Sequence, residues 1–404
     1  MPVVLARHRP SGADVTELRS RIGFEIELIA PPGASRLTLA ERIAAEHGGR
    51  ITRFFHTDSE PSLVPGMGHF WHLTPGFDVR DRDGGPLATL VDDITIVADL
   101  RREQVQAAAQ DPGHRPGAGT RERPDPDLYR VLSDDPRLLR LVADRTDAAA
   151  PYRTVLDDAA ELFGTAVETI GPVRRLRDRA GASIAMATAL AYGRERPCEI
   201  VTPPLRHDHE AALEALLRPA RAAGFGVPAE AAVHLHLDAA PFRSTAAFAN
   251  LVRLFGHWRE PLRAELETNP ACVRLQALPP ALLELVDADA DATDSGAAPS
   301  GEAERWRRMQ GLAAATGLTK YFDVNLTALL TDQPSRDTVE VRILPGALHG
   351  AEIARRAELV ERLLARCLRP EPLPRPSTDD PGTARAELRR LAGLIPSAEN
   401  ARPS

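Results

Sequence analysis

The chain has 404 residues, of which 43% are hydrophobic and 26% charged, as in a globular protein with a substantial buried core. The net charge is −7 and Arg supplies almost all of the positive charge, which argues against a basic surface for nucleic acid. Three widely spaced cysteines argue against a disulfide framework and a CxxC zinc site. Since no apolar run reaches about 18 residues, we expect a cytoplasmic protein that binds neither nucleic acid nor membranes.

Alternation of apolar and polar residues predicts strands, and apolar residues at every third or fourth position predict helices. The first strand is predicted at residues 21–29, and a helix at 37–47 ends at two glycines. Further strands are predicted at residues 51–55, 69–73, 87–100, 199–205, 232–238, 321–329 and 338–344. Further helices are predicted at 128–162, 211–223, 245–260, 353–367 and 384–394, and residues 183–192 are predicted as either helix or strand.

Three segments are predicted to be irregular from their composition. Residues 110–127 are rich in Pro, Gly and charge, residues 287–302 have few large apolar side chains, and residues 370–381 are rich in proline. We therefore predict a catalytic domain over 1–369, with insertions near 101–165 and 285–303, followed by a linker and short helix over 370–404. Because helices and strands do not alternate regularly, an α+β fold with a mainly antiparallel sheet is favoured.

The first predicted strand carries two glutamates on one face. Because side chains alternate along a strand, Glu25 and Glu27 point the same way at a separation of roughly 7 Å, and Phe24 and Ile26 point to the other side. Neighbouring carboxylates repel each other unless water or a cation screens them. The pattern therefore predicts either a solvent-facing strand edge or a site for a cation that prefers oxygen, such as Mg²⁺.

The strand predicted at 232–238 alternates most strictly. His234, His236 and Asp238 share one face, and apolar residues occupy the other. Such a face suits a metal or nucleotide site, and it equally suits a pair of hydrogen-bonded structural histidines. The pair by itself is a weak signal for zinc, because no cysteine or HExxH motif accompanies it.

Three other segments carry charged groups that would also fit ordinary exposed strands. Glu340 and Arg342 share a face, either as a surface salt bridge or as a metal ligand beside a guanidinium that holds a transferring phosphoryl group. Glu199 begins a strand that a double proline ends. Lys320, the only lysine, precedes Asn325, and it is either a chance survivor or a compact ammonium placed to meet a phosphate or carboxylate.

The order of these motifs carries a family resemblance. A GxExE strand, an ExxxPPL segment, an HxH strand, a KYxxVN segment and an ExR strand follow one another between residues 21 and 353. This set resembles the amidoligase family, which is similar in fold to glutamine synthetase and glutamate–cysteine ligase. The resemblance implies a glutamine-synthetase-like curved, mainly antiparallel sheet with helices on its outer face. It also implies ATP and Mg²⁺, or Mn²⁺, as cofactors, and an amide formed through an acyl phosphate.

The resemblance also implies roles for individual residues. The implied metal ligands are Glu25, Glu27, Glu199, His234 and Glu340. Arg342, Lys320 and Glu340 would be the catalytic groups, and His236, Asn325 and Arg342 would bind the nucleotide. Which of the two histidines binds metal is left open. The family often has a D-x-S segment, whose nearest counterpart is Asp93-Ile94-Thr95, about a hundred residues before Glu199.

The sequence leaves three alternatives to the ligase function open. They are phosphotransfer to a guanidino group, a hydrolase with the same metals, and a non-catalytic nucleotide- or peptide-binding relative. No GxSxG, GxxxxGK[ST] or well-placed GxGxxG motif is found, which argues against serine hydrolase, P-loop and Rossmann chemistry. The expected partners are a small-molecule or peptide carboxylate and an amine. The identity of both substrates and the oligomeric state are left open.

Overall fold

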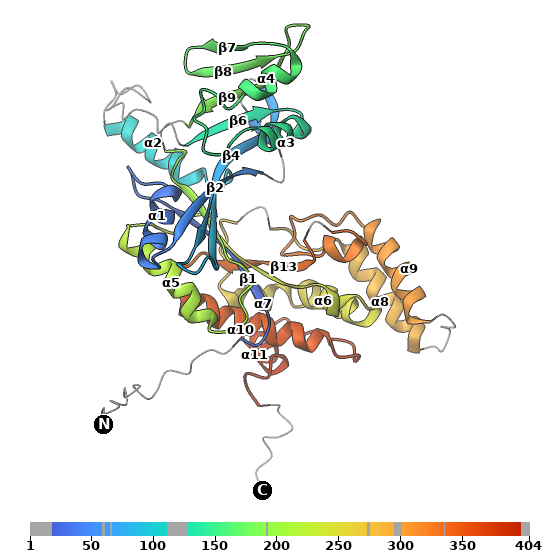
Figure 1. The fold of residues 1–404 in the computed structure, drawn as a ribbon. Coiled ribbons are helices and arrows are strands. Elements are labelled where there is room, and N and C mark those ends of the chain that lie inside the picture. Colours follow the sequence, from blue (N-terminus) through green and yellow to red (C-terminus); the bar gives the residue numbers. More distant parts are fainter. Residues whose placement is uncertain are drawn as a thin grey trace, which may run out of the picture.

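The computed structural model describes residues 18–58, 61–64, 67–110, 128–190, 193–272, 275–294, 301–334 and 336–396. Within these ranges thirteen strands form one sheet and helices pack against it, so the chain is an α+β protein (Figure 1). All the strand pairs of these ranges are antiparallel. The predicted fold class and sheet type are confirmed, and the closer likeness to glutamine synthetase stays a prediction.

Six neighbouring strands form the part of the sheet that carries the predicted motifs. In spatial order they are β12 (Val324–Asn325), β13 (Thr338–Pro345), β11 (Ala232–Asp238), β1 (Ile22–Ile29), β10 (Pro197–Val201) and β5 (Pro86–Val91). The register places Glu25 opposite His234, Glu27 opposite Glu199, and His236 opposite Glu340. Residues as far apart in sequence as Glu25 and His234, which are separated by 209 positions, are therefore direct neighbours at this point of the sheet.

The long strand β4 (Gly68–Arg80) joins this region to the rest of the sheet. Its second half pairs with β5 and with β2 (Arg50–Thr57), and its first half pairs with β3 (Ser62–Val64) and β6 (Tyr129–Ser133). Beyond β6 the sheet continues through β9 (Ser183–Ala189), β8 (Val173–Arg177) and β7 (Val167–Ile170). With α3 (Pro136–Arg145) and α4 (Asp157–Phe163) these strands form the lobe at the top of Figure 1, which has a hydrophobic core of its own.

One face of the central strands is covered by helices. Phe24, Ile26 and Leu28 of β1 are fully buried, as strand alternation requires, and they belong to the main hydrophobic core. Among the helices that contribute to this core are α1 (Arg36–Glu46), α5 (His209–Ala222), α6 (Thr245–His257), α7 (Arg259–Leu266) and α10 (Gly350–Cys367). The opposite face of the strands is left for the polar side chains. None of the helices in the described ranges combines the length and apolar composition of a membrane span.

Two predicted strands are shorter than expected because an Asx turn ends each of them. The predicted strand 87–100 stops with β5, because the Asp93 side chain accepts the backbone N–H of Thr95, and α2 (Ala98–Gln110) follows. The predicted strand 321–329 is reduced to Val324–Asn325. There the Asn325 side chain accepts the N–H of Thr327, and a 3₁₀ turn (Thr327–Leu330) follows.

Two other expectations about residues 128–162 and 287–302 were wrong. The predicted helix 128–162 begins with β6 and then contains α3 and α4, because Asp135 caps a new helix whose first residue is Pro136. In the segment 287–302, which was predicted to be irregular, the residues up to Asp294 belong to α8 (Pro280–Asp294), and Glu302 begins α9 (Glu302–Ala314). Residues 183–192, predicted as helix or strand, contain β9. Residues 111–127 of the predicted loop 110–127 and residues 295–300 lie outside the described ranges.

The C-terminal segment after α10 runs along α6 and α7. The Asn250 amide donates to the backbone oxygens of Cys367, Arg369 and Glu371, and the Trp258 indole donates to that of Pro374. Helix α11 (Pro381–Leu391) then packs on α7 through the buried Leu388 and through Arg385 and Arg389, which pair with Glu265. The proline-rich segment thus covers the main core and is part of the folded body.

Candidate active site

The polar face of the central strands forms the floor of a cavity of about 1040 Å³. All nine side chains to which the sequence assigned a role line it: Glu25, Glu27, Glu199, His234, His236, Lys320, Asn325, Glu340 and Arg342. Asp93 and Thr95 of the D-x-S counterpart line the same cavity. The structure therefore brings these groups together, from six separate segments of the chain, and their chemical roles stay predictions.

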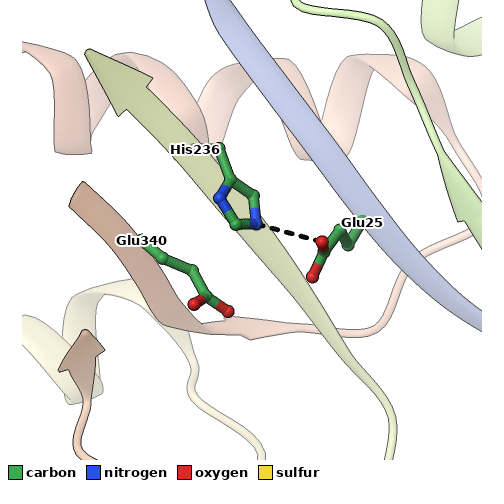
Figure 2. A group of neighbouring side chains, drawn as sticks. All are labelled: Glu25, His236 and Glu340. Atoms are coloured by element: carbon green, nitrogen blue, oxygen red, sulfur yellow. Dashed lines mark ion pairs between the residues drawn. The ribbon is translucent and has the colours of Figure 1, made fainter. Parts of the chain in front are cut away.

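The most compact group of potential metal ligands in the described ranges comes from three adjacent strands. One ligand atom each of Glu25 (β1), His236 (β11) and Glu340 (β13) lies within 4.8 Å of the other two (Figure 2). His236 Nε2 is 3.2 Å from Glu25 Oε1, while its Nδ1 is 3.0 Å from the Thr338 hydroxyl. The second hydrogen bond fixes the imidazole plane and directs Nε2 toward the carboxylates.

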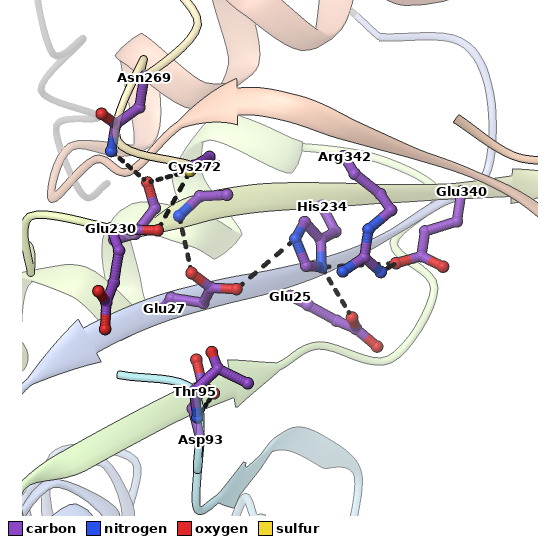
Figure 3. Close-up of polar contacts among 12 residues, drawn as sticks. Glu25, Glu27, Asp93, Thr95, Glu230, His234, Asn269, Cys272, Glu340 and Arg342 are labelled. Carbon is purple, nitrogen blue, oxygen red and sulfur yellow. Dashed lines mark hydrogen bonds and ion pairs between the residues drawn. The ribbon is translucent and has the colours of Figure 1, made fainter. Parts of the chain in front are cut away.

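His234 lies among three carboxylates rather than in this compact group. Its Nδ1 is 3.2 Å from Glu25 Oε2 and 3.5 Å from Glu340 Oε1, and its Nε2 is 3.6 Å from Glu27 Oε1 (Figure 3). Burial and the charge of Arg342 lower the pKa of His234, but the hydrogen bond to Glu25 and the charges of the glutamates outweigh them, so the pKa is raised. Of the two histidines, His236 has the better geometry for a metal and His234 for an ion pair.

Glu25 and Glu340 are the carboxylates best balanced by cations. Burial alone would raise the pKa of both, but hydrogen bonds from His234 and His236 hold that of Glu25 well below its usual range. The charge of Arg342, which pairs with Glu340, lowers the pKa of Glu340 against the same burial effect. The Asn325 amide donates to the other oxygen of Glu340 at 2.9 Å. Both carboxylates are therefore ionised and held in fixed positions.

Glu27 and Glu199 are less well balanced by cations. They lie opposite each other on β1 and β10, and Asp93 adds a third carboxylate beside them. Burial first and the Asp93 charge second raise the pKa of Glu27 to about 7. Burial, followed by the charges of Glu25, Asp93 and Glu27, raises the pKa of Glu199 well above its usual range. This side of the floor has an excess of buried acidic groups over cationic groups.

The comparison with protein families gives one result. A family model described as "Putative amidoligase enzyme" matches residues 18–364. The chain belongs to this amidoligase family. Its description indicates an enzyme that forms amide bonds. Comparisons with curated proteins and with solved structures gave no match.

A layer of hydrogen bonds behind the floor positions Glu27. The backbone N–H of Ala232 donates to Glu27 Oε2 at 2.8 Å, and the chain just before Ala232 is held from behind (Figure 3). Asn269 donates to the backbone oxygens of Ala229 and Ala231, and the Cys272 thiol donates to that of Glu230. The thiol therefore supports the wall of the site.

Sequence reasoning missed several residues of the cavity. Asp58 follows β2, Arg130 lies on β6, Arg194 precedes β10 and Arg336 precedes β13. Arg336 donates to Glu25 Oε1 and so adds a cation beside the compact group. Each of these residues is a single charge in a loop or in the lobe, with no repeated spacing to mark it. The alternation of the central strands was the only strong signal.

Proposed function

We propose that this amidoligase is an ATP- and Mg²⁺-dependent ligase that joins a carboxylate to an amine through an acyl phosphate. The observation that carries the proposal is the arrangement of the cavity floor. Five acidic groups (Glu25, Glu27, Glu199, Glu340 and Asp93) meet there beside only a few cations. A cavity of about 1040 Å³ is at the upper end of the usual range for ligand sites, which suits a nucleotide together with a second substrate.

The donor atoms of the floor fit divalent cations that prefer oxygen. Buried carboxylates with raised pKa values are groups whose charges lack a partner, and a Mg²⁺ ion is such a partner. Glu25, His236 and Glu340 would hold one ion, and Glu27 and Glu199 a second. A bound Mg²⁺ ion supplies positive charge to the phosphate oxygens of the nucleotide. The expected use of Mn²⁺ follows from the same carboxylate and imidazole ligands.

The first chemical step needs cations at the phosphate, which the chain supplies. An oxygen of the substrate carboxylate forms a bond to the γ-phosphorus, and the bond from that phosphorus to the bridging oxygen breaks as ADP leaves. Arg342 and Lys320 line the cavity where negative charge develops on the transferring group, and Arg336 lies beside Glu25. Guanidinium groups in these positions lower the repulsion between two anions, which is the main barrier to this step.

The second step makes the amide. The amine nitrogen forms a bond to the acyl carbon, the bond to the phosphate oxygen breaks, and the amine proton passes to solvent or to a cavity carboxylate. A dry, charged floor would disfavour competing attack by water. The use of ATP fits the cytoplasmic location predicted from the sequence. The partners proposed for the chain are a carboxylate and an amine, either of which is a small molecule or a peptide.

The test is a screen for ADP release over pools of acids and amines with Mg²⁺. A ligase releases ADP only when both substrates are present, and mass spectrometry finds a product lighter than the two reactants by one water. A phosphorylated product would identify a phosphotransferase instead. Arg342→Ala should abolish ADP release, and Glu161→Gln, on the surface of α4, should not change it. Unchanged release from Arg342→Ala would remove this residue from the mechanism.

A further inference from the structure

A second charged cluster lies in the cavity wall away from the acidic floor. At its centre is Asp92, which is fully buried at the end of β5. Arg130 Nη2 is 3.1 Å from Asp92 Oδ2, Arg194 Nη2 is 3.5 Å from Asp92 Oδ1, and Arg36 Nη1 is 4.0 Å from the same oxygen. One carboxylate therefore faces three guanidinium groups, which leaves an excess of two positive charges.

The three arginines differ in exposure, and the difference shows where the excess charge lies. Arg36 is fully buried behind Asp92 and also donates to the backbone oxygen of Pro75. The side chains of Arg130 and Arg194 are 16% and 18% exposed and line the cavity. Because Arg36 already balances the Asp92 charge from behind, the cavity side carries two guanidinium groups. We call Arg130 and Arg194 the arginine wall.

Two neighbouring titratable groups do little to cancel this charge. Burial first, and then the charges of Asp92 and Asp93, raise the pKa of Asp58 to about 8, so this carboxyl group is largely protonated near neutral pH. Burial lowers the pKa of His56, which is therefore neutral. Holding two cations at a partly buried wall is costly unless an anion reaches them.

The wall and the floor are separate faces of one cavity. Asp92 contacts the arginines, whereas the next residue, Asp93, acts on Glu27 and Glu199 of the floor. Arg130 comes from β6 of the lobe, a part of the chain that contributes no residue to the floor. The cavity thus has an acidic side for cations and a basic side for an anion, which a single extended ligand or two adjacent ligands would touch.

We propose that the arginine wall binds a second carboxylate of the acid substrate, so that the preferred substrate is a dicarboxylic acid or a peptide with an acidic group near the reacting one. The inference rests on the proposed ligase function. Paired arginines bind carboxylates through parallel hydrogen bonds, and a phosphate would offer similar oxygens. The nucleotide phosphates are already provided for at the floor, where Arg342 and Arg336 accompany the proposed metal ligands. The wall is therefore assigned to the acid.

The test measures binding without turnover. Calorimetric titrations in the presence of Mg²⁺ and a non-hydrolysable ATP analogue would compare acids that differ only in the second carboxylate, such as glutarate with glutaramate and glutamate with glutamine. Peptides that carry Glu or Gln beside the reacting carboxylate would extend the series. We expect the wild-type protein to bind each dicarboxylate at least roughly tenfold more tightly than the analogue that carries an amide in place of the second carboxylate. Absence of this preference in every pair would overturn the inference.

Variants assign the preference to the wall. Arg130→Gln and Arg194→Gln should remove the preference for the dicarboxylate and leave the affinity for the nucleotide analogue unchanged, whereas Arg130→Lys should keep part of it. Arg175→Gln, on β8 of the same lobe, is the matched control and should behave as wild type. A preference that survives in both Gln variants, or a loss that falls on the nucleotide, would overturn the inference. Since these titrations need no product, tight dicarboxylate binding without ADP release would refute only the ligase.

Discussion

Replacing Glu27 by glutamine should make the metal-free protein more stable above neutral pH. Glu27 is largely buried on the cavity floor, opposite Glu199 and close to Asp93, so its negative charge is unfavourable in the folded state. Glutamine has nearly the same shape, and its side-chain oxygen can still accept the N–H of Ala232. The substitution therefore removes the charge and keeps the packing.

The size of the effect follows from the pKa of Glu27. The ordinary pKa of this side chain is 4.5, and its pKa in the folded protein is about 7. Between pH 4.5 and about 7, the folded state therefore binds the proton more tightly than the unfolded chain does. Below the pKa that Glu27 has in the unfolded chain, its charge has no effect on stability. The charge becomes destabilising as the pH rises from this value to the pKa in the folded protein, and above the latter the effect is complete. A difference of about 2.5 pKa units corresponds to roughly 3 kcal/mol. The substitution also removes the repulsion that the Glu27 charge exerts on Glu199, which adds to the gain in stability.

Urea denaturation with a metal chelator at about pH 5 and about pH 8 measures the effect. Glu27→Gln should exceed the wild type in unfolding free energy by a few kcal/mol at the higher pH, and the difference should shrink toward the lower pH. Exposed Glu161→Gln is the control and should show no such dependence on pH. Equal stabilities at both pH values, or a less stable Glu27→Gln protein at about pH 8, would refute the reasoning.

Three further predictions concern the metal, the lysine and the backbone. Mg²⁺ should raise the melting temperature of the wild type at about pH 8, and the Glu340→Gln protein should lose most of this increase. An undiminished increase in the variant would exclude Glu340 as a ligand of the metal. Lys320→Arg should lower ADP release at saturating ATP if a compact ammonium is required, and full activity would mark Lys320 as a bystander. Gly49→Ala would place a Cβ 1.8 Å from a backbone oxygen of β4 and should cost about 2 kcal/mol or more in urea denaturation. Gly311→Ala, in open space on α9, should be neutral or stabilising.

The sequence predicts the cavity floor well because strand alternation has a period of two. Once residues 21–29 form a strand, Glu25 and Glu27 must share a face, and the same holds for His234 with His236 and Glu340 with Arg342. The apolar residues between them turn these faces away from the core. What alternation could not supply is which strands lie next to each other; the resemblance to a family implied only that these residues share one site.

The wall and the ends of the strands were harder to predict. Asp92 and Arg130 are 38 residues apart and meet only because β4 bridges β5 and β6, which is a tertiary fact that no local spacing encodes. The ends of β5 and β12 depend on single hydrogen bonds from backbone N–H groups to the side chains of Asp93 and Asn325. A segment of apolar residues continues past both points, so periodicity alone extended the strands too far.

The C-terminal segment bears on how the protein should be produced. The family match ends at residue 364, but the chain from there to α11 seals the exposed sides of α6 and α7. A recombinant version that stopped at the match would uncover Trp258, would leave the buried Asn250 amide without its backbone oxygens, and would remove Leu388 from the core. Loss of that cover would leave an apolar surface prone to aggregation, so a recombinant version should retain α11 (Pro381–Leu391).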